Sequence, residues 1–236
     1  MAITHPIVTG QVADAASYAT VVTYVYFVGI PHGVLGSDDR AMREIEDSVR
    51  TAERSGDDLA LSNAQMALGY ALVHRPLAAE RDRGRELLAQ LSDAFRRGGR
   101  HLGDLPLVGV YWARESARCG DRDDATPLVH AAVDHLVDEG QLLTWGMPAT
   151  GVLVETLLDR GSDADMAEAE AAIERLATAP ADEGLVIRDI WLLRLRALLA
   201  RGRGDATAYV TFRDRYRDSA RALDFEGHIA WAEAMR

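Results

Sequence analysis

Apolar residues recur every three or four positions along most of this chain. This spacing places them on one face of an α-helix. Alternating β-branched residues, which would indicate strands, are confined to residues 18–30, and that run reads equally well as a buried helix. The sequence therefore predicts an all-α fold. The clearest helical runs are residues 59–74, 84–95, 127–140, 166–177 and 191–202.

Four similar short stretches separate these runs. Each one ends a helical run with Arg or Glu, turns at a Gly and continues with Asp and Ala. Gly closes a helix readily in the left-handed conformation, and Asp caps the free N–H groups at the start of the next helix. The helices are therefore expected to form hairpins. We predict hairpins over residues 12–55, 57–97, 104–139, 146–178 and 185–222, followed by a capping helix over 227–235.

The leading helices of these hairpins begin about 40 residues apart, a period typical of helix-pair repeats. Small residues on three leading helices, Gly69, Ala113 and Gly151, would allow close helix crossings. A hairpin of this kind buries its apolar face only by stacking on its neighbours. We therefore predict one tetratricopeptide-like helical-hairpin solenoid of about eleven helices over residues 1–236. Such solenoids commonly bind a protein or peptide on their concave face.

Composition excludes several kinds of chemistry. The chain has 236 residues and a net charge of −11, and all 26 of its basic residues are Arg. Without Lys it can form neither a Walker-type phosphate loop nor a Schiff base. The acidic balance argues against a nucleic-acid partner. Cys119 is the single cysteine, so no disulfide framework is expected.

The sequence shows neither a secretory signal nor a membrane-spanning segment. The first residues lack the basic and apolar segments of a secretory signal. The most apolar run, residues 18–30, is too short to span a bilayer. We expect a cytoplasmic protein without a membrane partner.

No arrangement of side chains points to catalysis or to a metal. His130 and His135 share a helix, but they are five residues apart, so their side chains point in directions that differ by roughly 140° around the helix. Metal-binding pairs on a helix are usually four residues apart. No G-x-S-x-G motif frames a nucleophile. We therefore expect a non-catalytic protein with no cofactor and no metal site, and an enzyme of unknown reaction is the weaker alternative.

Aromatic and Arg side chains on the predicted leading helices are the best candidates for a binding site. Arg114 and Arg118 lie one turn apart on one face, so they are expected to bind a ligand carboxylate. The alternative for Tyr111, Trp112 and Trp191 is that they form interhelical core. An open, Arg-lined groove would favour a peptide ligand, whereas a closed apolar pocket would favour a small-molecule sensor. The candidates are Tyr111, Trp112, Arg114, Arg118, Trp145, Arg188, Trp191 and Arg194.

The apolar stretch over residues 24–33 suggests a further contact. If the first hairpin is the exposed end of the array, this stretch leaves apolar area to be buried. We therefore expect the N-terminal hairpin to mediate homodimerisation or packing against an upstream repeat.

Residues 203–228, RGDATAYVTFRDRYRDSARALDFEGH, resemble the C-terminal end of large actinobacterial regulators. In those proteins a class III adenylyl cyclase domain or a LuxR-type DNA-binding domain is joined to an ATPase module and a tetratricopeptide-like array. The resemblance extends from about residue 38 onward. It implies a partner-binding or small-molecule-sensing array of a signalling system, and the family's catalytic parts have no matching positions here.

Overall fold

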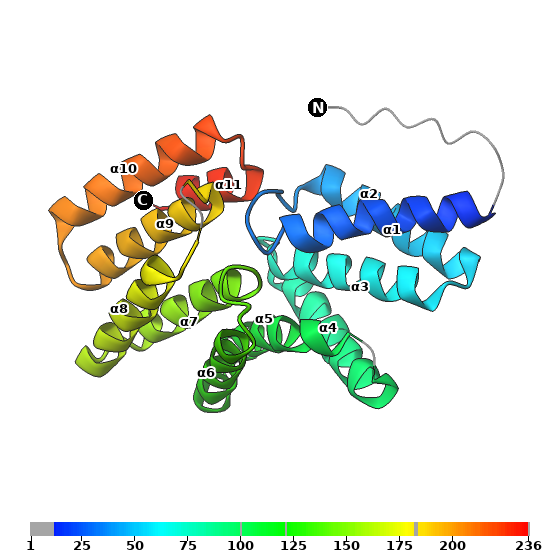
Figure 1. The fold of residues 1–236 in the computed structure, drawn as a ribbon, viewed down its shortest axis with the longest axis horizontal. Helices are drawn as coiled ribbons and strands as arrows, with labels where there is room; N and C mark the ends of the chain where they lie inside the picture. The colour runs from blue at the N-terminus through cyan, green and yellow to red at the C-terminus, as the bar shows by residue number, and fades with distance from the viewer. Residues whose placement is uncertain (1–11, 100, 121, 182–183, 236) are drawn as a thin grey trace.

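The computed structural model describes residues 12–99, 101–120, 122–181 and 184–235 (Figure 1). This part of the chain contains α-helices and one short 3-10 helix, and no β-strand. The all-α fold predicted from the sequence pattern is confirmed. The helices are α1 (Val12–Gly29), α2 (Asp39–Ser55), α3 (Asp58–Val73), α4 (Ala78–Gly98), η1 (Leu102–Asp104), α5 (Leu105–Arg118), α6 (Arg122–Asp138), α7 (Gly146–Arg160), α8 (Asp163–Thr178), α9 (Val186–Gly202), α10 (Ala206–Ala222) and α11 (Glu226–Ala234).

The helices pack as consecutive hairpins that form an arc. Each helix contacts the next one in sequence, and the leading helices α3, α5, α7 and α9 also contact one another in that order. In Figure 1 these leading helices lie toward the inside of the arc, and α4, α6 and α8 lie on its outside. The described chain is therefore a helical-hairpin solenoid, as predicted.

The corners before α3 and α10 cap these helices with Asp57 and Asp205, as predicted, whereas Ser162 and not an Asp caps α8. Asp57 accepts hydrogen bonds from the backbone N–H groups of Leu59 and Ala60 at the start of α3. Before it, Gly56 ends α2 with a φ of 70°. The corner between α9 and α10 differs from the sequence expectation. Gly202, which the pattern predicts as the left-handed residue that closes the helix, is the last residue of α9, and the left-handed residue is Gly204.

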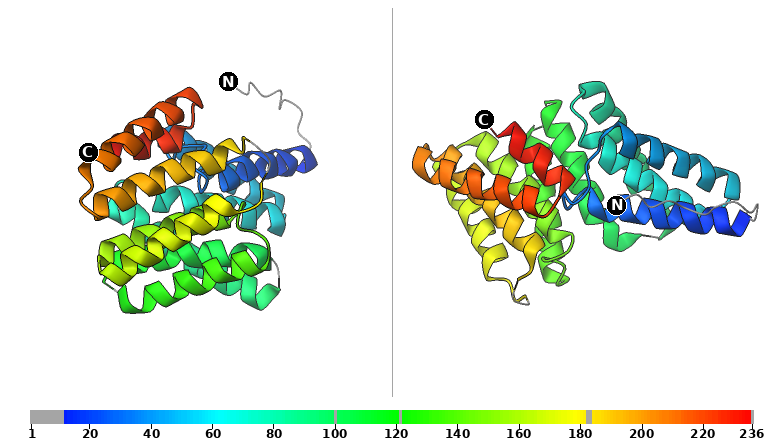
Figure 2. Two further views of the ribbon diagram at one scale, coloured as in Figure 1. Left: turned by 60° about the vertical axis from the view of Figure 1, so that its left-hand side comes forward. Right: turned by 90° about the horizontal axis from the view of Figure 1, so that it is seen from above.

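A loop of residues 30–37 joins the two ends of the arc. The backbone N–H of His228 in α11 donates to the carbonyl of Gly33 at 2.9 Å, and that of Glu226 donates to the carbonyl of Val34 at 3.1 Å. In the views of Figures 1 and 2 the loop after α1 reaches the centre of the arc, next to α11. The solenoid thus closes on itself, and α11 is held by the first hairpin as well as by α10.

The same loop contacts the middle of the array. Nε2 of His32 lies 3.1 Å from the carbonyl oxygen of Thr144, and the hydroxyl of Tyr111 donates to the carbonyl of Pro31 at 3.5 Å. The loop of residues 30–37 therefore contacts both α5 and the segment that joins α6 to α7.

Most of the apolar stretch that suggested an intermolecular contact is buried within its own chain. Tyr26, Phe27 and Ile30 are at most 6% exposed and belong to the main core. Among the residues of α1 whose side chains are described, the large apolar ones that are exposed are Val21, Tyr24 and Val25. Homodimerisation through the N-terminal hairpin stays a prediction, and these three residues are available for it. No described helix has the length and hydropathy that a bilayer-spanning segment needs.

Candidate functional site

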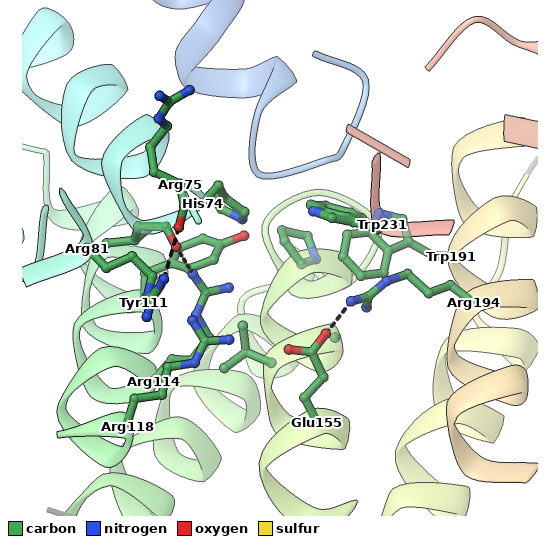
Figure 3. Close-up of a pocket in the computed structure, with 14 residues that line it drawn as sticks. His74, Arg75, Arg81, Tyr111, Arg114, Arg118, Glu155, Trp191, Arg194 and Trp231 are labelled. Carbon is green, nitrogen blue, oxygen red and sulfur yellow. Dashed lines mark hydrogen bonds and ion pairs between the residues drawn. The ribbon is translucent and has the colours of Figure 1, made fainter. Parts of the chain in front are cut away.

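A pocket of about 420 Å³ lies on the inner face of the arc, where four leading helices meet α11 (Figure 3). Arginines dominate its wall, and aromatic side chains close one end. The lining residues are Val73, His74, Arg75, Arg81, Tyr111, Arg114, Arg118, Pro148, Gly151, Val152, Glu155, Trp191, Arg194 and Trp231.

Helical spacing explains why these residues face one another. Tyr111, Arg114 and Arg118 follow each other at intervals of three and four along α5, so they share one face. On α7, Gly151 and Glu155 have the same relationship. Because α5, α7 and α9 are neighbours on the inner side of the arc, their matching faces form a continuous wall.

Three arginines converge on one buried carboxylate. Glu115 is 2% exposed, and its Oε1 accepts a hydrogen bond of 2.8 Å from Arg114 Nε and another of 2.8 Å from Arg118 Nη1. Its Oε2 lies 3.5 Å from Arg81 Nε. We refer to Arg81, Arg114 and Arg118 as the arginine cluster. One carboxylate thus holds three guanidinium groups in place.

Backbone carbonyls fix the arginine cluster further. Arg114 Nη2 donates to the carbonyl of Val73 at 2.8 Å, which ties α5 to the end of α3. Arg81 Nη1 donates to the carbonyl of Arg75 at 3.2 Å. The guanidinium of Arg114 also lies over the ring of Tyr111, 4.7 Å from its centre. These contacts preorganise the cluster before any ligand binds.

The opposite wall carries an ion pair between Glu155 and Arg194 (Figure 3). Burial alone would raise the pKa of Glu155, but Arg194 and Arg114 bring it below its usual value. Burial likewise lowers the pKa of Arg194, and Glu155 more than offsets this. Both side chains are therefore charged. Arg194 lies 4.9 Å from the ring centre of Trp231 and 5.4 Å from that of Trp191, so indole rings line this side.

His74 lies between the two walls and is neutral. Burial, with a contribution from Arg114, lowers its pKa to about 3. Its Nδ1 lies 2.7 Å from the carbonyl oxygen of Tyr70. The ring packs against Tyr111 and Trp231, with ring centres 5.1 Å and 5.8 Å away. At neutral pH it adds no charge to the pocket.

Five of the eight residues predicted from the sequence meet at this pocket. They are Tyr111, Arg114, Arg118, Trp191 and Arg194. Trp191 combines both of its predicted roles, because it is only 3% exposed and still lines the cavity.

The other three predicted residues lie elsewhere. Trp112 follows Tyr111 directly, so it is turned by about 100° around the helix, and it lines a separate, mainly apolar groove of about 490 Å³ between α4, α5 and α6. The ring centre of Trp145 lies 5.1 Å from that of Phe27. Arg188 donates to the carbonyl of Ala179 at 3.1 Å. None of these three lines the pocket that holds the arginine cluster.

Sequence reasoning missed several residues of the pocket. Glu155 had a usable signal, because it lies four residues after Gly151 on the face of a leading helix. Arg81 and Trp231 had no signal in the sequence. Arg81 reaches the site from the start of α4, and Trp231 reaches it because the arc closes. Within the described residues, no group of three or more His, Cys, Asp or Glu side chains could hold a metal ion.

Comparison with protein-family models, with curated proteins and with solved structures gives no match. A function for this chain therefore has to be argued from the geometry and charge of its own site.

Proposed function

We propose that this chain is a non-catalytic binding module that receives an acidic group of a protein or peptide partner in the pocket on its inner face. The arrangement of Arg81, Arg114 and Arg118 around the single carboxylate of Glu115 is the observation that carries the proposal. Guanidinium groups bind carboxylates and phosphates through paired charge-assisted hydrogen bonds. A cluster fixed in advance loses little entropy when it does so.

The polarity of the lining favours a charged segment of a larger partner. Pockets for small molecules are mostly apolar with a few polar groups, whereas this pocket is lined by five arginines. The inner face of a solenoid offers an extended surface on both sides of such an anchor point. The regulatory role that the resemblance to actinobacterial regulators implies, and the cytoplasmic location expected from the sequence, are part of this proposal.

A small-molecule sensor is the second candidate. The volume of about 420 Å³ falls within the range of small-molecule sites, about 300–1,000 Å³. Trp191 and Trp231 would supply the apolar surface that such a ligand needs. An organic anion could then place its charge on the arginine cluster and its body on the indole rings.

An array of synthetic peptides with acidic, neutral and basic sequences tests the proposal. We expect the wild-type chain to bind acidic peptides and the Arg114→Glu/Arg118→Glu variant to lose this binding at least about tenfold. The Arg201→Glu/Arg215→Glu variant is the matched control, because it makes the same charge change at two exposed residues outside the pocket.

Two results would count against a peptide ligand. Equal binding of acidic peptides by both double variants would exclude the pocket as the site. Binding of small organic anions without any acidic peptide would favour the sensor.

A further inference from the structure

We propose that the group bound by the arginine cluster is the dianion of a phosphate monoester. This inference rests on the proposed function and specifies its ligand. The phosphate could belong to a phosphorylated side chain of a partner protein or to a free small phosphate ester. Both present the same three terminal oxygens to the pocket.

The charge of the pocket matches a dianion. The arginine cluster and Arg194 bring four positive charges, and Glu115 and Glu155 bring two negative ones. Two positive charges are left without a carboxylate. A phosphate monoester carries about −1.5 to −2 at pH 7, whereas a single carboxylate carries only about −1. A phosphate monoester therefore neutralises the two excess positive charges, whereas a carboxylate neutralises only one of them.

Arg75 also lines the pocket, but Arg75 and its acidic partners leave the two excess positive charges of the pocket unchanged. Its guanidinium is bound to Glu80 at 3.1 Å and to Asp39 at 2.6 Å, and it also donates to the carbonyl of Ser37. Asp39 is 77% exposed and lies on the α2 side of Arg75, so solvent screens its charge from the arginine cluster. Arg75 and its acids form a structural group of their own.

The unused N–H groups of the cluster also fit a tetrahedral anion. Each guanidinium has five N–H donors. Within the described residues, Arg81 Nη2, Arg114 Nη1 and Arg118 Nη2 have no hydrogen-bond acceptor. Three arginines from two helices thus keep N–H donors for a ligand. A phosphate has three terminal oxygens to receive them, whereas a carboxylate has two in one plane.

The opposite wall directs the anion to the cluster. Glu155 is charged and faces the cavity in Figure 3, so it disfavours a dianion on its side. Trp191 and Trp231 beside it suit the uncharged part of the ligand. The phosphate is therefore placed against Arg81, Arg114 and Arg118, and the rest of the molecule against the indole rings.

Isothermal titration with matched probes tests this inference. The probes are a capped peptide with one phosphoserine, the same peptide with Glu or with Ser in its place, and glycerol 2-phosphate, each at up to roughly 10 mM. We expect the phosphoserine peptide to bind at least about tenfold more tightly than the Glu peptide, because it makes at least one more charge-assisted hydrogen bond. The Ser peptide should not bind.

Two variants locate the binding. Arg118→Gln removes one donor at a half-exposed position and should weaken binding of the phosphoserine peptide about tenfold or more. Arg201→Gln, which removes an exposed arginine outside the pocket, should leave it unchanged.

The outcomes separate the two proposals. If the Glu and phosphoserine peptides bind equally, the dianion inference is wrong and the acidic-partner function stands. If neither binds and acidic peptides on the array also fail, both are wrong. If glycerol 2-phosphate binds as tightly as the phosphoserine peptide, the phosphate chemistry is supported and its source is a free ester.

Discussion

The indole of Trp191 fills the space that a side chain at Gly151 would need. A Cβ at Gly151 would lie 2.4 Å from Cζ3 of Trp191, well inside contact distance. Because Gly151 has no side chain, α9 packs closely on α7 and Trp191 closes the base of the pocket. The small residue predicted at this position serves a contact between successive hairpins, whereas Gly69 serves the contact with Leu88 inside its own hairpin.

The Gly151→Ala substitution should therefore destabilise the fold. We expect a loss of about 1–3 kcal/mol in the free energy of unfolding, as for overpacked cores, measured by denaturant titration. The matched control is Gly109→Ala in α5, where nothing lies within 4 Å of a new Cβ. Ala is the better helix former, so the control should be neutral or slightly more stable. Equal losses in both variants would show that Trp191 adapts without cost.

Closure of the arc can be tested at Gly33. Its φ is 72°, and a Cβ there would lie 2.6 Å from Trp231. Gly56 has nearly the same φ, 70°, but nothing within 4 Å of a Cβ. Gly56→Ala should cost about 1–2 kcal/mol for backbone strain alone. Gly33→Ala should cost about 1–3 kcal/mol more and increase the radius of gyration measured by X-ray scattering. An unchanged radius with a cost equal to that of Gly56→Ala would contradict the closure described here.

Glu115 should be essential for stability although it lies in a binding site. Removing its charge with Glu115→Gln leaves three arginines without their shared carboxylate, and loss of one buried ionic partner costs about 3–5 kcal/mol. Urea unfolding measures this loss, and added phosphate should restore part of it. Glu170→Gln is the control, because Glu170 forms an exposed ion pair with Arg203 and should have no measurable effect. A Glu115→Gln variant as stable as the wild type would contradict this role.

Acid should destabilise the chain through three histidines, of which His32 and His228 are buried and His74 is half-buried. Burial lowers the pKa of His74 and of His228 to about 3, and it also lowers that of His32. In the unfolded chain these groups take up protons near pH 6.5. Below that pH the unfolded state binds protons that the folded state does not, so stability falls as the pH drops from about 6.5 toward 3 and is constant above about 7.

Unfolding at pH 7.5 and at pH 5 measures this effect. We expect a lower midpoint at pH 5, and a smaller difference between the two pH values in the His74→Gln variant. His135→Gln, at an exposed position, should behave like the wild type. A midpoint that does not change between the two pH values would contradict the assignment of neutral histidines.

The helices could be predicted closely because their signals are local. The apolar period marks each helix, and corners such as Gly56–Asp57 carry their own capping chemistry. Part of the site was also local, since Tyr111, Arg114 and Arg118 share one face of a leading helix. These features depend only on residues within a few turns of one another.

The rest of the site depends on how the hairpins curve, which no local pattern contains. Trp231 reaches the pocket because residues 30–37 hold α11 to the first hairpin. Tyr111 and Trp112 were both candidates, and only the packing of the hairpins shows that Tyr111 lines the pocket and Trp112 the groove between α4, α5 and α6. Small rotations between repeats add up over the array, so contacts between its ends cannot be placed from sequence.

Hydrogen–deuterium exchange with a bound acidic peptide shows directly where the ligand binds. An occupied pocket on the inner face should slow exchange at the end of α3, along α5 and α7, and around Trp191, with the largest change at residues 111–118. Slower exchange confined to the outer groove between α4 and α6, or an unchanged pattern at residues 111–118, would contradict the assignment of the arginine cluster as the binding site.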